Sequence, residues 1–183
     1  IISGVANWKI QNNASDSIFF DVDGLEIEKV TINNRVETSF TIGEKDAILG
    51  SKLSVLIQPQ TEVVSIYYKT TPGSRALQWL NEEQTHGKNH PFLFTQSQAV
   101  LARTWLPCQD SPGIRYTYNA KVKVPTELMA LMSANNPQEK SATGEYEFSM
   151  ENPIPSYLMA LAVGDIAFAP ISDRTGVYAE PGM

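Results

Sequence analysis

The sequence contains very little cysteine and histidine. A single cysteine, Cys108, excludes an intrachain disulfide, and the two histidines, His86 and His90, leave few conventional ligands for a metal. No apolar run approaches the ~20 residues that a helix needs to span a bilayer. With 14 basic against 20 acidic residues, the chain also has no basic stripe for a phosphate backbone. We therefore expect no disulfide scaffold, no membrane span and no nucleic-acid partner.

The residues that are present provide enough apolar material for a substantial core. The chain has 183 residues, of which 42% are hydrophobic and 9% aromatic, and this size suits one globular domain. Its first residues, IISGVANWKI, resemble the middle of a strand, so we expect the chain to be truncated at its start.

Apolar and polar residues alternate along much of the chain, as is typical of half-buried β-strands, and the longest such stretch runs from 114 to 124. Further strands are predicted at 16–22, 26–32, 35–42, 53–57, 62–69, 144–150 and 157–166, the last one central in its sheet. Asn33 and Asn34 tolerate positive φ and predict a hairpin turn. The best candidates for short helices are 97–104 and 125–133. The pattern predicts an all-β, mostly antiparallel fold in a single domain.

The two histidines lie four residues apart in HGKNH, the spacing of the zinc ligands in H-E-x-x-H metalloproteases. Gly87 occupies the place of the catalytic glutamate, however, and Pro91 disfavours helical geometry at His90. A catalytic zinc usually needs a third protein ligand, and the chain has no third histidine. The stretch 86–90 is therefore predicted to be a solvated loop without a metal.

A second tempting motif is SMENP at 149–153, because its Met-Glu-Asn is the tail of the G-x-M-E-N box of one aminopeptidase family. The box requires a glycine two residues before the methionine, and here Phe148 stands there. Polar and apolar residues alternate from 146 to 151, which predicts an ordinary strand with a solvent-facing row.

The segment LPCQDSP contains two further residues that could carry chemistry. Cys108 would serve as a nucleophile only beside a histidine, and a thiol enzyme of this kind would lose activity on alkylation. Most lone cysteines are instead small buried hydrophobes. Asp110 precedes Ser111 and Pro112 and is interpreted as an Asx-type turn former rather than a catalytic acid.

Five blocks of the sequence resemble the amino-terminal domain of the aminopeptidase N family of zinc metallopeptidases, and within it the leukotriene A4 hydrolase branch. They follow the family's order and span nearly the whole chain: ALQWL (76–80), HPFLFTQSQA (90–99), LPCQDSP (106–112), VPTELMALMSA (124–134) and IPSYLMALAVG (154–164). The resemblance implies a large β-saddle or sandwich, in agreement with the alternation.

The resemblance also implies where the chemistry lies. In the family, the zinc site and the G-x-M-E-N box belong to the catalytic domain that follows, so this chain is expected to contain no catalytic and no metal-binding residues. Its contribution is the loop TQSQA, where Gln96, Gln98 and Ala99 match residues that receive the amino terminus of the peptide substrate. Many members carry an acidic residue at the second amide position, whereas Gln98 agrees with the leukotriene hydrolase branch.

These expectations describe a domain of a larger enzyme. The parent protein would be a zinc metalloaminopeptidase that releases amino-terminal residues, with zinc ligands outside this chain, and the 183 residues alone would be inactive. The expected partners are the peptide substrate and the catalytic domain, and the isolated fragment is expected to self-associate. The alternative is a stand-alone β-domain that binds a protein or glycan without catalysis. The sequence leaves open the preferred residue, an epoxide hydrolase activity and the compartment.

Overall fold

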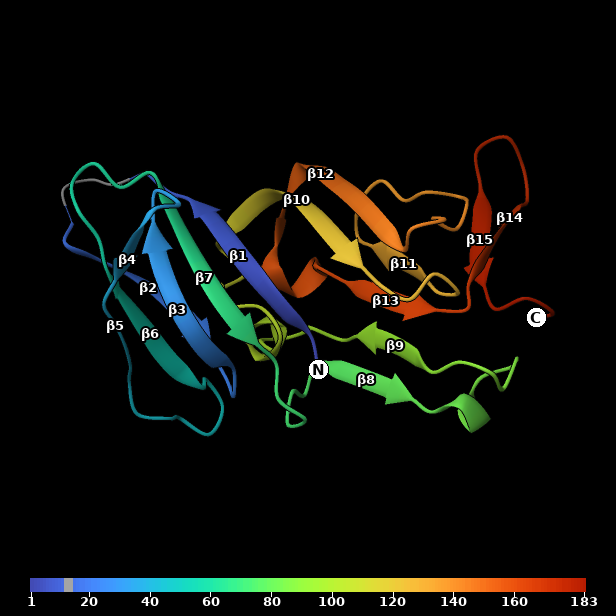
Figure 1. Cartoon of the computed structure of the whole chain (residues 1–183), viewed down its shortest axis with the longest axis horizontal. Coiled ribbons are helices and arrows are strands. Elements are labelled where there is room, and N and C mark those ends of the chain that lie inside the picture. The colour runs from blue at the N-terminus through green and yellow to red at the C-terminus, as the bar shows by residue number, and fades with distance from the viewer. Residues whose placement is uncertain (12–14) are drawn as a thin grey trace. The chain divides into compact units, whose positions relative to one another are not determined.

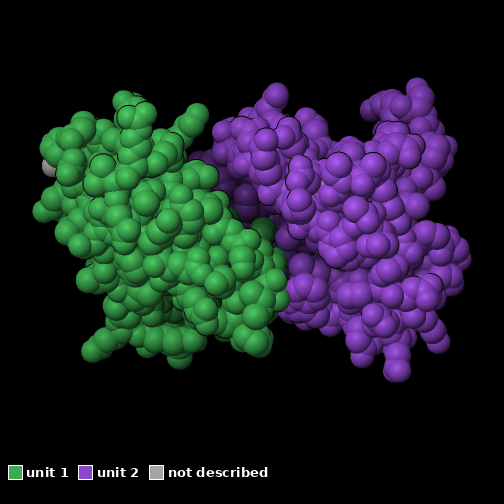
Figure 2. Space-filling view, in the orientation of Figure 1, with its two compact units in different colours: residues 1–76, 98–114 green, residues 77–97, 115–183 purple. Residues whose placement is uncertain are grey.

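A computed structural model describes residues 1–11 and 15–183, and the described residues form β-strands joined by turns, loops and three short 3-10 helices (Figure 1). The chain divides into two compact units, coloured separately in Figure 2. Unit 1 comprises residues 1–76 and 98–114, and unit 2 comprises residues 77–97 and 115–183. All strand pairs are antiparallel, so the predicted all-β antiparallel fold is confirmed. None of the described helices is long and apolar enough to cross a membrane.

Unit 1 contains a four-stranded sheet of order β1-β7-β3-β4 and a three-stranded sheet of order β2-β6-β5. Its strands are β1 (Ser3–Lys9), β2 (Ser17–Val22), β3 (Glu26–Ile32), β4 (Val36–Thr38), β5 (Phe40–Ile42), β6 (Ser51–Leu56) and β7 (Val63–Lys69). One core contains fully buried residues from both sheets, among them Val30, Ile66, Leu53 and Val55. Burial of these β-branched and aliphatic side chains between the sheets stabilises the unit.

The strands and the turn predicted between residues 16 and 69 of unit 1 are confirmed except at one point. Asn33 and Asn34 both have positive φ, at 50° and 60°, and form the hairpin turn between β3 and β4, as predicted. The predicted strand 35–42 is instead two strands, because the chain passes at Ser39 from the four-stranded to the three-stranded sheet. A strand that changes sheets keeps its alternation, so the pattern alone could not reveal the break.

Unit 2 contains a four-stranded sheet of order β11-β13-β9-β8 and two antiparallel pairs, β10 with β12 and β14 with β15. Its strands are β8 (Leu77–Leu80), β9 (Phe92–Thr95), β10 (Arg115–Lys123), β11 (Met129–Met132), β12 (Glu145–Pro155), β13 (Leu161–Gly164), β14 (Ala167–Pro170) and β15 (Gly176–Ala179). Tyr146 and Phe148 of β12 are buried, and the Tyr146 hydroxyl donates to the carbonyl of Leu128 at 3.0 Å. This bond satisfies the polar group of a buried aromatic side chain.

Both predicted helices are wrong. Residues 129–132 form β11, which pairs with β13, so the helical spacing in 125–133 reflects strand residues buried beside another strand. The stretch 97–104 contains turns and the 3-10 helix η2 (Ala102–Thr104). The strand predicted at 157–166 is interior to its sheet as expected, but it is shorter because Ser156–Leu158 form the 3-10 helix η3.

Candidate functional site

The three residues predicted to contact substrate lie in an irregular stretch that follows β9. Gln96 belongs to unit 2, and Gln98 and Ala99 belong to unit 1. All three are exposed, Gln98 and Ala99 lie in a turn, and the peptide bond between them is cis. Their side chains are therefore accessible to a ligand on the surface of the unit that carries each of them.

Residues on both sides of Gln96 are anchored to unit 2. Before it, the Thr95 hydroxyl oxygen accepts a hydrogen bond from the Leu161 backbone N–H at 2.9 Å. After it, the Ser97 hydroxyl, which is buried, donates to the Met159 carbonyl at 3.3 Å. An exposed amide flanked by two such bonds has a backbone position set by the sheet.

After Ala99, the chain is anchored to unit 1 through Thr104. This side chain is only 1% exposed. Its hydroxyl donates to the Leu101 carbonyl at 2.7 Å and accepts from the Ala76 N–H and the Ser74 hydroxyl, both at 3.1 Å. A single buried hydroxyl thus uses its donor and both acceptor sites to join the segment 101–104 to the segment 74–76.

A buried ion pair lies next to this anchor. Arg103 and Asp110 are each 3% exposed, and the Arg103 Nε donates to Asp110 Oδ2 at 3.0 Å. Asp110 Oδ2 also accepts from the Arg103 backbone N–H at 3.2 Å. The Asp110 carboxylate thus reaches back to Arg103, a contact that the interpretation of Asp110 as an Asx-type turn former did not include.

Cys108 does not have the environment of a nucleophile. Its side chain is fully buried, and its backbone carbonyl accepts from the Asp21 N–H at 2.7 Å. Burial, together with the negative charges of Asp110 and Asp21, raises the pKa of the thiol well above its ordinary value. Since the thiolate is the reactive species, the prediction of a small buried hydrophobe is confirmed and the thiol-enzyme hypothesis loses its support.

The histidine stretch 86–90 is a loop of bends, as predicted. His86 is exposed, and its backbone N–H, not its imidazole, is bonded to the Glu180 carboxylate at 2.9 Å. Among the residues that the structure describes, no group of three or more His, Cys, Asp or Glu side chains is arranged to bind a metal ion. The sequence also contains no H-E-x-x-H, so the residues present do not fit a catalytic zinc.

The SMENP stretch lies on β12, as predicted from its alternation. Glu147 points to solvent and forms an exposed ion pair with Lys121 of β10 at 2.6 Å, whereas Phe148 is buried. The alternation of an exposed ion pair with a buried aromatic side chain is that of an ordinary strand with one solvent-facing side.

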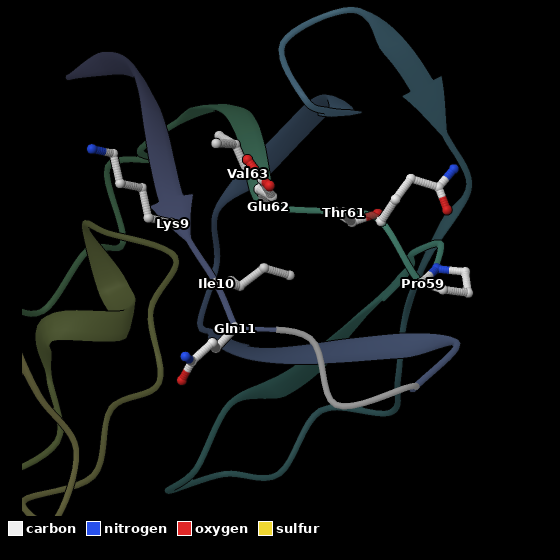
Figure 3. A pocket seen from close by; sticks show the side chains of 8 residues that line it. Lys9, Ile10, Gln11, Pro59, Thr61, Glu62 and Val63 are labelled. Carbon is white, nitrogen blue, oxygen red and sulfur yellow. The ribbon is translucent and has the colours of Figure 1, made fainter.

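A surface hollow of about 600 Å³ in unit 1 is separate from the predicted residues (Figure 3). It lies at the end of β1 and is lined by Lys9, Ile10, Gln11 and the segment 59–63. It is open to solvent, and the charged side chains among these lining residues are Lys9 and Glu62.

Sequence comparison identifies the family. The profile of the Peptidase M1 N-terminal domain matches residues 1–158. This chain belongs to that family. This chain is 41% identical over 174 residues to a leukotriene A-4 hydrolase from Xenopus laevis, and the match covers 90% of this chain and 28% of that protein. It is 38% identical over 172 residues to leucine aminopeptidase 2 from Yarrowia lipolytica, covering 92% of this chain and 26% of the relative.

Solved structures agree with this assignment. Native leukotriene A4 hydrolase from Saccharomyces cerevisiae superimposes with a TM-score of 0.85 at 33% identity, and the match covers 98% of this chain and 28% of that one. An M1 zinc metallopeptidase from Deinococcus radiodurans shares the fold, with a TM-score of 0.71 at 21% identity over 96% of this chain and 41% of that one. The chain thus spans 26% to 41% of the length of these relatives, and the predicted family resemblance is confirmed.

The buried Arg103–Asp110 pair was missed at the sequence level. Its signal was available: a buried-looking segment, AVLARTWLPCQD, contains one cation and one anion seven residues apart. Charged residues almost never lie in such surroundings unless they are paired.

Proposed function

We propose that this chain is the amino-terminal, non-catalytic domain of a zinc aminopeptidase that releases amino-terminal residues from peptides. The support is its membership of the M1 N-terminal domain family and the much greater length of its leukotriene hydrolase and aminopeptidase relatives. The domain packs on a catalytic domain that supplies the zinc ligands. No step at the metal is assigned to the residues of this chain.

Within that enzyme, the stretch 96–99 forms part of the pocket for the substrate's amino terminus. The observation that carries this proposal is that Gln96, Gln98 and Ala99 are exposed while the residues around them are anchored by buried hydrogen bonds. Surface loops on a rigid scaffold commonly carry binding residues.

Gln98 is suited to recognise an ammonium group. A terminal ammonium has donors and no acceptor, so a pocket that desolvates it must offer oxygens, and the Gln98 side-chain carbonyl supplies one. A neutral amide binds the cation less strongly than a carboxylate would. Gln96 orients the loop and contacts the first side chain.

The test is a set of alanine variants in the full-length enzyme, assayed with aminoacyl anilides. Gln98→Ala should cost about 1.5 to 3 kcal/mol of transition-state stabilisation, roughly a ten- to hundredfold loss of kcat/KM, with an unchanged melting temperature. Gln96→Ala should cost less. The matched control is Gln60→Ala, since Gln60 is an exposed glutamine of unit 1 whose side-chain amide donates to the exposed Gln58 and lies outside the 96–110 segment, and its kcat/KM should stay near the parent value.

If Gln98 has only a structural role, Gln98→Ala will lower the melting temperature while the folded protein keeps its kcat/KM. Parental turnover of Gln98→Ala would refute the assignment of this stretch to substrate binding.

The coarser proposal has a test of its own. Sequencing the gene beyond the codon for Met183 should reveal a G-x-M-E-N box and then H-E-x-x-H within the next several tens of codons. A stop codon there would instead favour a stand-alone β-domain that binds a protein or glycan.

A further inference from the structure

We propose that Arg103, paired with Asp110, is a positioning residue that sets the location of Gln98 in the substrate pocket. This inference rests on the proposed function of the 96–99 stretch and adds a residue that does not itself touch substrate.

The Arg103 guanidinium makes directed bonds with all three of its nitrogens. Nε donates to Asp110 Oδ2 at 3.0 Å, Nη2 donates to the Asp110 carbonyl at 2.8 Å, and Nη1 donates to the Leu49 carbonyl. The backbone N–H of Arg103 adds a bond to Asp110 Oδ2. A planar fork bonded at three points fixes orientation as well as distance.

The pair is also fixed to the core of unit 1 through β2. The Asp23 N–H donates to the Arg103 carbonyl at 3.0 Å, and the Asp110 N–H donates to Asp21 Oδ2 at 2.8 Å. β2 buries Phe20 and Val22 in the core, so its position is set by packing. The segment from Arg103 to Asp110 is therefore hydrogen-bonded at one end to β2 and at the other to Asp23, the residue that follows β2.

Only a few residues separate Arg103 from Gln98, and hydrogen bonds and burial hold them in place. Leu101, three residues after Gln98, has a carbonyl that accepts from the Thr104 N–H at 3.0 Å and from the Thr104 hydroxyl at 2.7 Å. Ala102, between them, is fully buried. A change at Arg103 thus has only a few residues over which to relax before it moves Gln98.

A stability role alone does not account for this arrangement. Replacing a buried ion pair with well-packed apolar residues is often neutral or stabilising, because the desolvation of both charges opposes their attraction. An apolar pair, however, would not impose the directed contacts to Asp110 and Leu49 that the guanidinium makes. The geometry therefore favours placement of the segment as the function of the pair.

The experiment compares four full-length variants with the parent by kcat/KM on an aminoacyl anilide, below the onset of unfolding of every variant. They are Arg103→Lys, Gln98→Ala, the double variant, and Arg75→Lys as the matched control. Arg75 is another guanidinium of unit 1 paired with an aspartate, Asp23, but it is half exposed, so lysine can replace it. Arg103→Lys keeps the positive charge but loses the planar guanidinium that bonds Asp110 and Leu49 at three points.

We expect Arg103→Lys to lower kcat/KM by about ten- to hundredfold, because small misplacements of a binding group cost this much. Arg75→Lys should match the parent. The decisive result is the double variant: if Arg103 acts through Gln98, adding Arg103→Lys to Gln98→Ala should lower kcat/KM by less than about threefold more. Should Arg103→Lys fail to fold, Asp110→Asn in the same cycle removes the charged acceptor and should behave alike.

The outcomes separate the two proposals. If Gln98→Ala is impaired but the losses of the two single variants multiply in the double variant, Arg103 has a general structural role and the positioning inference is overturned. Parental kcat/KM in folded Arg103→Lys overturns it as well. If Gln98→Ala is itself unimpaired, the pocket function of the loop fails, and the positioning inference fails with it.

Discussion

The stretches 86–90 and 98–110 differ in how their ionisable side chains are buried and bonded, and the histidine-containing stretch is the less buried of the two. The first contains both histidines of the chain, yet His86 is exposed, and the described residues form no metal-binding group. The second contains no histidine, yet its Arg103 and Asp110 are buried and bonded to each other. The fold thus places a buried, bonded ion pair in the stretch 98–110 rather than in the histidine loop, which residue type alone does not indicate.

The largest expected difference between the two stretches is in stability. Arg103→Ala in the 183-residue chain removes the guanidinium that neutralises the buried Asp110 carboxylate, and should lower the free energy of unfolding by about 3 to 5 kcal/mol. His86→Ala should change it by no more than about 0.5 kcal/mol, since the side chain is exposed. Urea unfolding followed by tryptophan fluorescence measures both. Similar losses for the two variants would remove the distinction between the stretches.

The cost of adding a side chain at Gly50 and at Gly87 tests the same difference between the two stretches. Gly50 ends the loop whose Leu49 carbonyl binds Arg103; it has φ of +69°, and a Cβ there would lie 2.5 Å from the Val22 carbonyl oxygen. Gly50→Ala should therefore cost about 2 kcal/mol. At Gly87, in the histidine loop, a Cβ would meet only Asp165 Oδ2, at 3.9 Å.

Gly87→Ala should consequently leave the urea midpoint near that of the parent. An equal shift for both glycines would show that the loop ending at Gly50 is no more constrained than the histidine loop.

A smaller, pH-dependent effect on stability is expected at Asp23, whose backbone N–H bonds the Arg103 carbonyl. Burial of Asp23 opposes its ionisation, but hydrogen bonds and charges from Lys45 and Arg75 outweigh burial and lower its pKa below the ordinary 3.8. A lowered pKa in the folded state stabilises the fold above the unfolded pKa, and this contribution is lost as pH falls through the folded value.

Asp23→Asn should therefore be less stable than the parent by about 1 kcal/mol near pH 7, and the difference should shrink towards zero below the pKa of the folded carboxyl. Melting curves of both proteins across that range measure it. A difference independent of pH would mean that the ion pairs of Asp23 do not contribute.

The smallest expected effect is on metal content. The 183-residue chain should retain no stoichiometric zinc after dialysis and should not cleave aminoacyl anilides, because two loop histidines do not provide a ligand set with an open position. One zinc per chain, lost in a variant with both His86→Ala and His90→Ala, would contradict this prediction.

The sequence predicted the parts of the fold that depend on local pattern. Alternation located the strands between residues 17 and 69 in unit 1 and β10 and β12 in unit 2, and Asn33 and Asn34 located a hairpin turn, whereas β8, β9, β14 and β15 were not predicted. It failed where tertiary context decides: the sheet change at Ser39 preserves alternation, and the run 129–132 is a strand because it pairs with β13. Propensity is weaker than such pairing.

In the candidate site, too, some residues were predicted from the sequence and others depend on tertiary packing. Gln96, Gln98 and Ala99 came from the family resemblance, whereas the buried Arg103–Asp110 pair that follows them in the chain was not predicted. Its recognition requires knowledge that both side chains are buried, and burial depends on long-range packing against β2.

The most direct test of the account is whether Gln98 recognises the substrate's amino group. Two competitive inhibitors of the full-length enzyme, identical except that one lacks the terminal amine, should be compared on the parent and on Gln98→Ala. If Gln98 recognises the amino group, Gln98→Ala should bind the amine-bearing inhibitor about tenfold or more weakly and bind the other one as the parent does. Equal changes for both inhibitors, or no change for either, would contradict it.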